Sequence, residues 1–169
     1  MSGPAVVLVG APGAGKSTIG RLVAERLNLA FRDTDGDVEA AAGKSIADIF
    51  IDDGEGAFRA MERTAVHDAL TTHTGVLAVG GGAVLDDVTR AALIGRIVVW
   101  LDVGLAAATK RVGLARDRPV LTLDPRSTLS RLLNERKPLY AEVATVIVDT
   151  DDRDPVEIAE DVVASVAAA

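Results

Sequence analysis

Short apolar runs rich in β-branched residues alternate along the chain with longer segments whose apolar residues have helical spacing. The clearest runs cover residues 5–9 and 97–101, two further runs cover 76–79 and 144–148, and a weaker one covers 29–32. Each is followed by a glycine or aspartate turn and then by a helical pattern. Continuous apolar strands separated by helices are typical of a parallel sheet covered on both faces. The pattern therefore predicts an α/β fold with a five-stranded parallel sheet.

The clearest helix is expected at residues 16–27, where Ile19, Leu22, Val23 and Leu27 share one face. Other helices are expected at 86–94, 105–112 and 155–166, and one or two at 45–70 with a break near Gly54. No linker, repeat or shift in composition divides the chain. We therefore expect one domain over residues 1–169.

Composition narrows the class of protein further. The 169 residues include no cysteine, which excludes a disulfide framework, a thiolate zinc site and a cysteine nucleophile. The net charge of −7 argues against general nucleic-acid binding. No apolar run approaches the roughly 20 residues that a membrane-spanning helix needs, and no targeting signal is visible. We expect a cytoplasmic protein that binds neither nucleic acid nor membrane.

One stretch departs from the acidic balance. Between Lys110 and Lys137 there are eight basic and three acidic residues, so this stretch carries +5 and the rest of the chain −12. It is either a solvated face or a site for an anionic molecule. Pro119 and Pro125 within it predict an irregular loop rather than a helix.

The sequence Gly10-Ala11-Pro12-Gly13-Ala14-Gly15-Lys16-Ser17 matches the phosphate-binding pattern G-x-x-x-x-G-K-[ST]. Its glycines allow backbone N–H groups to turn toward a phosphate, Lys16 reaches the β- and γ-phosphates, and Ser17 binds Mg²⁺. The motif lies between a predicted strand and a predicted helix, which is its proper context. The residues expected at the nucleotide are Ala11, Pro12, Gly13, Ala14, Gly15, Lys16, Ser17 and Thr18.

The nucleotide is expected to be ATP. Guanine-specific proteins usually carry an Asn-Lys-x-Asp motif, and neither Asn28 nor Asn134 begins one.

Two carboxylates follow the weak strand in Asp33-Thr34-Asp35. We expect this segment to be extended, so that the two side chains point the same way. One interpretation is a helix N-cap with a solvated charge. The other assigns one carboxylate to the water shell of Mg²⁺ and one to the hydroxyl of an acceptor.

Three other motifs suggest a second half of the site. Arg59 and Glu62, in Gly-Glu-x-x-Phe-Arg-x-x-Glu, are i, i+3 neighbours on a helix and could simply form a surface pair. The triplet Gly80-Gly81-Gly82 follows a strand, where ligands bind in open α/β sheets, although a flexible turn would look the same. The basic stretch contributes Arg118-Pro119 and Arg136-Lys137-Pro138-Leu139-Tyr140.

In this order and over nearly the whole chain, these motifs resemble those of the shikimate kinases. The resemblance implies a P-loop NTPase fold of the nucleoside monophosphate kinase type, with an acceptor-binding part at about 33–62 and a lid at about 113–125. It implies transfer of the ATP γ-phosphoryl group to the 3-hydroxyl of shikimate, with Mg²⁺ as cofactor, and we expect a monomer.

The resemblance also assigns roles to residues. Asp33 would contact Mg²⁺ through water, and Asp35 would bind the acceptor hydroxyl. Arg59, oriented by Glu62, and Arg136 would hold the shikimate carboxylate, while Gly80, Gly81 and Gly82 close on the ring. Arg118 would reach the transferred phosphate, which makes Lys16, Asp35 and Arg118 the catalytic residues. The residues implied on the adenine side are Arg111, Arg153 and Pro155.

Two alternatives remain at this point. One is a kinase for another small acceptor, such as gluconate or a nucleoside monophosphate. The other is an ATP-binding module without catalysis, which would not need Asp35 or the two acceptor arginines.

Overall fold

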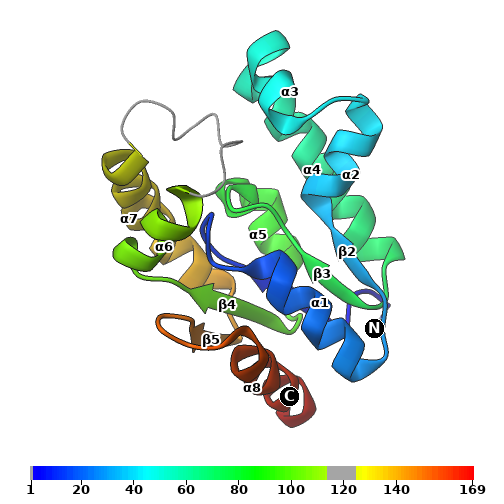
Figure 1. Ribbon diagram of the computed structural model, residues 1–169. Coiled ribbons are helices and arrows are strands. Elements are labelled where there is room, and N and C mark those ends of the chain that lie inside the picture. Colours follow the sequence, from blue (N-terminus) through cyan, green and yellow to red (C-terminus); the bar gives the residue numbers. More distant parts are fainter. Residues whose placement is uncertain (1, 114–124) are drawn as a thin grey trace.

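The computed structural model describes residues 2–113 and 125–169, and its centre is a five-stranded sheet (Figure 1). The strands lie in the order β2-β3-β1-β4-β5, and every neighbouring pair is parallel. All carboxyl ends therefore lie at one edge of the sheet. The strands are β1 (Val6–Val9), β2 (Phe31–Asp33), β3 (Val76–Ala78), β4 (Val98–Asp102) and β5 (Val146–Asp149).

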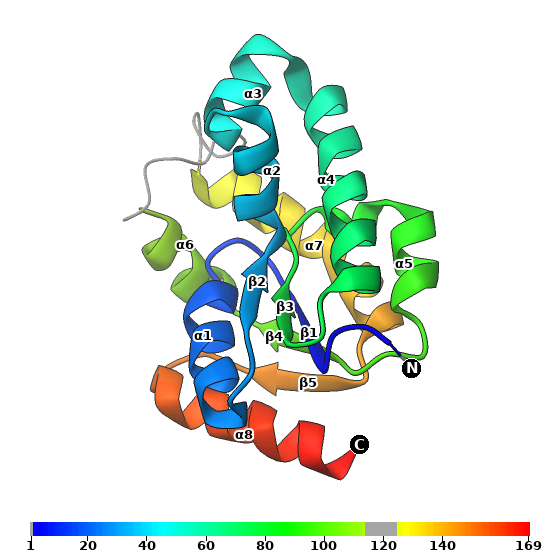
Figure 2. The same ribbon diagram turned by 90° about the vertical axis from the view of Figure 1, so that its right-hand side faces the viewer.

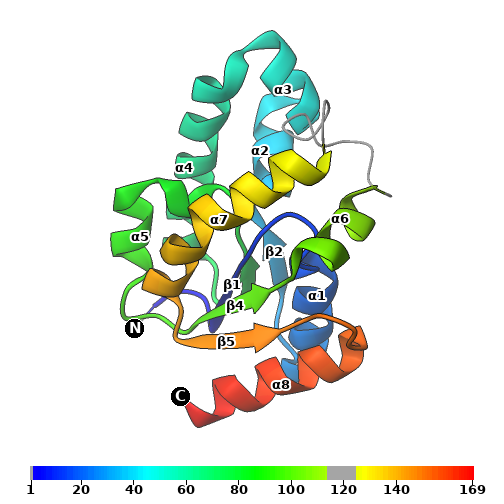
Figure 3. The same cartoon turned by 90° about the vertical axis from the view of Figure 1, so that its left-hand side faces the viewer.

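Helices cover both faces of the sheet. Figures 2 and 3 show α1 and α8 against one face and α4, α5 and α7 against the other. The helices described are α1 (Lys16–Leu27), α2 (Thr34–Ala42), α3 (Ile46–Asp52), α4 (Gly54–Thr72), α5 (Asp87–Leu93), α6 (Leu105–Gly113), α7 (Pro125–Val143) and α8 (Pro155–Ala168), with a 3₁₀ turn at Ala83–Leu85.

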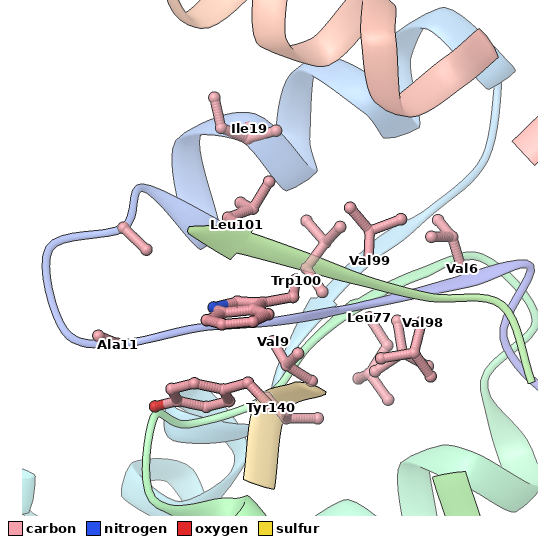
Figure 4. Close-up of a cluster of buried hydrophobic side chains, with 14 of the residues drawn as sticks. Val6, Val9, Ala11, Ile19, Leu77, Val98, Val99, Trp100, Leu101 and Tyr140 are labelled. Atoms are coloured by element: carbon pink, nitrogen blue, oxygen red, sulfur yellow. The ribbon is translucent and has the colours of Figure 1, made fainter. Parts of the chain in front are cut away.

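The core fills both sides of the sheet because strand side chains alternate between its faces. Along β4, Val99 and Leu101 point toward Ile19 of α1, and Trp100 points toward Tyr140 of α7 (Figure 4). The rings of Trp100 and Tyr140 lie 5.6 Å apart between centroids with a tilt of 36°. Trp100 is 8% exposed and belongs to this core.

A smaller unit of α2, α3 and the first half of α4 extends beyond the carboxyl end of β2 (Figure 2). Val38, Ile49 and Phe58 form a separate apolar cluster within it. This unit includes the segment 33–62 that was expected to bind the acceptor.

The structure confirms the fold class, the five parallel strands and helix 16–27. The break near Gly54 is also confirmed, since α3 ends at Asp52 and α4 begins at Gly54, whose φ is +87°. Two strands lie later than expected. β2 begins at Phe31 rather than residue 29, and β5 begins at Val146 rather than 144.

Two predictions from the local pattern were wrong. The segment at Asp33–Asp35 is not extended, because helix α2 begins at Thr34 with Asp33 as its N-cap. The expected loop around Pro125 is instead the start of α7, since proline lacks only an N–H that a first helical turn leaves unpaired. The rest of the expected lid, residues 114–124 with Pro119 and Arg118, lies outside the described residues.

Across residues 2–113 and 125–169, no helix is both long and apolar enough to cross a membrane.

Gly75 offers a test of the packing between β2 and β3. A Cβ at Gly75 would collide with the backbone carbonyl of Ala30, which accepts the Val76 N–H. We predict that Gly75→Ala lowers the free energy of unfolding by about 1–3 kcal/mol because a backbone atom has no room to move aside. Denaturant unfolding measures the change.

Gly56→Ala is the matched control, because a Cβ there would meet no described atom within 4 Å. In helix α4 it should be neutral or stabilising by up to about 1 kcal/mol. Equal stability of the two variants would contradict the assigned contact between β2 and β3.

Candidate active site

The loop between β1 and α1 has the conformation of a phosphate cradle. Gly10, Gly13 and Gly15 have φ values of +152°, +82° and +89°, which side chains rarely allow. Among the described residues no side chain caps α1, and its first turn holds no acidic residue. The positive end of the helix dipole therefore points at the loop, and the first turn of α1 itself adds no carboxylate to weaken it.

Lys16 and Ser17 lie at the mouth of this cradle. The Lys16 ammonium donates hydrogen bonds to the carbonyls of Gly10 at 2.7 Å and Ala11 at 3.2 Å, so it lies across the loop. A cavity of about 320 Å³ opens in front of it. The cavity is lined by Pro12, Gly13, Gly15, Lys16, Ser17, Thr18, Asp33, Asp35 and Gly81.

Asp33 is the N-cap of α2, and its two carboxylate oxygens accept different donors. Its Oδ1 accepts the Asp35 N–H at 2.9 Å and caps α2, while its Oδ2 accepts the Ser17 hydroxyl at 2.6 Å. The cap fixes the carboxylate, so its second oxygen faces the cradle. Asp35 lies in the first turn of α2 and reaches the same cavity.

The triglycine loop, Gly80-Gly81-Gly82, follows β3 and touches both halves of the site. A Cβ at Gly80 would lie 2.8 Å from Asp35 Oδ1 and 2.6 Å from Glu62 Oε2. A Cβ at Gly81 would lie 3.1 Å from Pro12 Cδ, and one at Gly82 would collide with the Arg59 guanidinium. The loop lacks side chains because acceptor-side groups and the P-loop occupy that space.

Arg59 and Glu62 form a half-buried ion pair rather than a surface pair. Arg59 Nη1 donates to Glu62 Oε1 at 2.8 Å, and the two side chains are 22% and 5% exposed. Burial raises the pKa of the Glu62 carboxyl, with the Arg59 guanidinium opposing the shift and Asp35 adding to it. The carboxylate therefore depends on the cations beside it to stay charged.

Arg136 lies on α7 and is 5% exposed. Its charge and that of Arg59 both lower the pKa of Glu62, so two arginines far apart in the sequence lie near the same carboxylate. Within the described part of the chain, Arg136 Nε is a buried donor without a hydrogen-bond partner. A buried unpaired donor is costly, and an anionic ligand would satisfy it.

The residues implied on the adenine side are described only in part. Arg153 and Pro155 follow β5 at the carboxyl edge of the sheet. Arg153 is engaged with α8, since it donates to Asp161 at 2.6 Å and Glu157 at 3.3 Å. Arg111 belongs to α6, but its side chain lies outside the described part, as does Arg118.

Sequence reasoning assigned no role to two residues that touch the triglycine loop. The Thr34 hydroxyl accepts the Gly80 N–H at 3.2 Å, and the Tyr140 hydroxyl donates to the Gly81 carbonyl at 2.6 Å. Both residues belong to motifs that were recognised in the sequence: Thr34 follows Asp33, and Tyr140 lies one helical turn after Arg136. Their hydrogen bonds to the triglycine loop could not be predicted, because the partners lie 46 and 59 positions away in the sequence.

Comparison with known proteins agrees with this arrangement. The family model described as shikimate kinase matches residues 12–167. A shikimate kinase of Salinispora arenicola is 57% identical over 98% of this chain and 99% of its own length. The solved shikimate kinase from Acinetobacter baumannii in complex with shikimate superposes with a TM-score of 0.93 at 34% identity, covering 98% of this chain and 93% of that one.

A gluconokinase from Sinorhizobium meliloti shares the fold with a TM-score of 0.62, but at 21% identity over 96% of this chain and 91% of its own it indicates the fold alone. The match to the shikimate kinase family sets aside both alternatives, a kinase for another acceptor and a non-catalytic ATP-binding module. The P-loop cradle, the buried arginine–glutamate group and the matches over nearly the full length lead to one conclusion: the chain belongs to the shikimate kinase family, the P-loop kinases that phosphorylate shikimate in aromatic amino-acid biosynthesis.

Proposed function

We propose that this protein transfers the γ-phosphoryl group of ATP to the 3-hydroxyl of shikimate, using the residues described above. The observation that carries the proposal is the position of the triglycine loop. A Cβ added to the loop would meet Pro12 of the nucleotide cradle on one side and Asp35, Glu62 or Arg59 on the other, so the loop lies between these groups. A phosphate in the cradle and an acceptor beside Asp35 would therefore be neighbours, as direct transfer requires.

The cradle supplies the nucleotide half. Backbone N–H groups of residues 13–18 would surround the β-phosphate, and Lys16 would leave the Gly10 and Ala11 carbonyls for the β- and γ-phosphates. This exchange replaces two hydrogen bonds to neutral carbonyls with stronger ones to charged oxygens. The resemblance adds Arg118 at the transferred phosphate and Arg111, Arg153 and Pro155 around the adenine.

The residues present fit a magnesium ion. Ser17 Oγ and Asp33 Oδ2 are hard oxygen donors held 2.6 Å apart at the edge of the cavity. Within the described residues no group of three or more acidic or histidine side chains could hold a metal by itself. That is expected for Mg²⁺, which keeps several waters and binds mainly through substrate phosphates. When bound, it would neutralise charge on the β- and γ-phosphates.

The acceptor half is built for an anion bearing hydroxyl groups. The planar guanidinium of Arg59, held by Glu62, and the unsatisfied Nε of Arg136 would hold the carboxylate of shikimate. Asp35, beside Gly80, would accept a hydrogen bond from the reacting hydroxyl and orient it toward the γ-phosphate. Transfer passes through a loose transition state, so Asp35 needs to take the proton only late in the reaction.

An assay of ADP release, with and without shikimate, tests the proposal directly. ADP should form rapidly only when both ATP and shikimate are present, and NMR of the product should place the phosphate on the 3-hydroxyl. Release that does not depend on shikimate would overturn the proposed function.

Lys16→Met should abolish transfer while the fold survives. The variant removes the ammonium aimed at the transferring group, which should lower kcat by orders of magnitude. Lys137→Met is the control. Lys137 is exposed on α7, so this variant should retain activity. Near-normal turnover in a folded Lys16→Met protein would contradict the assignment of the P-loop.

Asp33→Asn should separate the capping role of Asp33 from its metal role. Asparagine caps helices as well as aspartate, so α2 should remain stable. The Mg²⁺ concentration for half-maximal activity should rise by about 10- to 100-fold, the usual cost of losing an outer-sphere partner. Asp86→Asn, at the cap of α5, is the control, and its Mg²⁺ requirement should match the wild type. If both variants have the wild-type requirement, Asp33 is only a cap.

Arg59→Lys should weaken shikimate binding by about ten- to a hundredfold and leave ATP affinity unchanged. An ammonium cannot reproduce the two-pronged contact of a guanidinium, and a hydrogen bond to a charged group is worth roughly 1.5–3 kcal/mol. Titration calorimetry with each substrate measures both affinities. Arg63→Lys is the matched control, since Arg63 lies one turn along α4, is 53% exposed and pairs with Asp86.

The methyl ester of shikimate tests the same contact from the ligand side. It keeps the hydroxyl groups and loses the negative charge, so it should be a very poor acceptor. Equal turnover of the ester and the acid would refute the carboxylate clamp.

A further inference from the structure

Two buried hydroxyl groups hold the triglycine loop from opposite directions. Thr34, which is 0% exposed, accepts the Gly80 N–H at 3.2 Å from the start of α2. Tyr140, which is 1% exposed, donates to the Gly81 carbonyl at 2.6 Å from α7 on the far side of the loop. Together they attach adjacent residues of the loop to two separate parts of the fold.

We propose that Thr34 and Tyr140 are positioning residues for phosphoryl transfer. Their hydroxyl groups determine where the triglycine loop lies, and the loop determines where the acceptor binds relative to the P-loop. Neither side chain is required to touch a substrate. The inference rests on the proposed function, because it concerns the placement of the acceptor in that reaction.

The loop needs external support because of its composition. Three consecutive glycines have wide conformational freedom, and ordering them costs more entropy than ordering other residues. The space left by their missing side chains is occupied by groups of the acceptor side, since Asp35 and Glu62 border Gly80 and Arg59 borders Gly82. A displaced loop would let these side chains shift as well. A misplacement of about 1 Å can cost roughly a hundredfold in rate.

Tyr140 is itself rigidly placed. Its ring packs on Trp100 of β4 (Figure 4), so its hydroxyl is fixed with respect to the sheet. Arg136 lies one helical turn earlier on α7, so one helix carries both the acceptor clamp and an anchor of the loop. Burial raises the pKa of Tyr140 to about 12, against the lowering effect of the charge of Arg136 and of its hydrogen bond to the Tyr140 hydroxyl, and the hydroxyl remains a donor at neutral pH.

Thr34 stands between the two functional aspartates. Asp33 faces Ser17 and Asp35 borders Gly80, while Thr34 holds the backbone of Gly80 itself. Three consecutive residues at the start of α2 would thus set the metal carboxylate, the loop and the acceptor carboxylate as one unit.

The test uses steady-state kinetics of Tyr140→Phe, Thr34→Val and Thr34→Ser. Tyr140→Phe and Thr34→Val keep the packing and remove one hydroxyl, whereas Thr34→Ser keeps the hydroxyl. We expect each of the first two variants to raise the KM for shikimate about three- to tenfold and to lower kcat, as the loss of one hydrogen bond would. The KM for ATP should not change, because the cradle has its own backbone contacts. Thr34→Ser should recover most of the loss.

Thr145→Val is the matched control. The Thr145 hydroxyl also accepts a backbone N–H, that of Val98, and donates to the Arg96 carbonyl, but it lies at the amino end of β5, away from the site. Its kinetics should match the wild type, and thermal melting of every variant separates loss of fold from loss of position. If Thr34→Val fails to fold, Tyr140→Phe decides the question.

Wild-type kinetics in Tyr140→Phe and Thr34→Val would overturn the inference. So would equal losses toward both substrates together with a lower melting temperature, because a merely structural role predicts that result. A wild-type protein that does not phosphorylate shikimate would instead overturn the proposed function, and the inference would fall with it.

Discussion

The arrangement of the site depends on the neighbouring positions of β2, β3 and β1 in a parallel sheet. Because the strands are parallel, their carboxyl ends lie at one edge of the sheet. At this edge β2 ends in Asp33, β3 is followed by the triglycine loop, and β1 is followed by the P-loop. The middle strand, β3, places glycines between the two flanking segments. A Cβ at Gly80 would run into Asp35 and Glu62, and a Cβ at Gly81 would press on Pro12 of the P-loop.

Electrostatics explains why the acceptor side is charged although it is buried. A buried ion pair contributes little net stability, since removing both charges from water offsets their attraction. The pair of Arg59 and Glu62 is better understood as a means of orientation. Glu62 neutralises part of the positive charge of Arg59 and Arg136 and keeps the guanidinium of Arg59 in a fixed plane against Gly82. If the two arginines bind the carboxylate of shikimate as proposed, the ligand meets donors that are already placed, which reduces the entropy lost on binding.

The sequence predicted the framework of this fold well. Buried parallel strands are continuous apolar runs, and the P-loop has a fixed spacing, so both are visible locally. The start of α2 was misread because Asp33 and Asp35 are equally compatible with an extended segment and with a capped helix. The start of α7 was misread because proline ends most helices but also begins many.

The groups that join the two halves of the site were visible as motifs but not as contacts. The sequence displayed Arg59 and Arg136 almost eighty positions apart, and only the resemblance to a family suggested that they meet. In the structure both lie beside Glu62, because α4 and α7 cover the same face of the sheet (Figure 3). Spacing along a helix predicts neighbours three or four residues apart, whereas contacts between helices depend on the tertiary packing.

Asp33 can cap a helix and face the P-loop at the same time because its two carboxylate oxygens have different partners. A carboxylate has two oxygens, and each can accept separate donors. One oxygen satisfies the first turn of α2, which any helix of this kind needs, and the other remains directed at Ser17. A side chain fixed by a structural hydrogen bond loses little further entropy when it engages a ligand. The helix cap therefore prepares the site, and the interpretations of Asp33 as a cap and as a functional carboxylate are compatible.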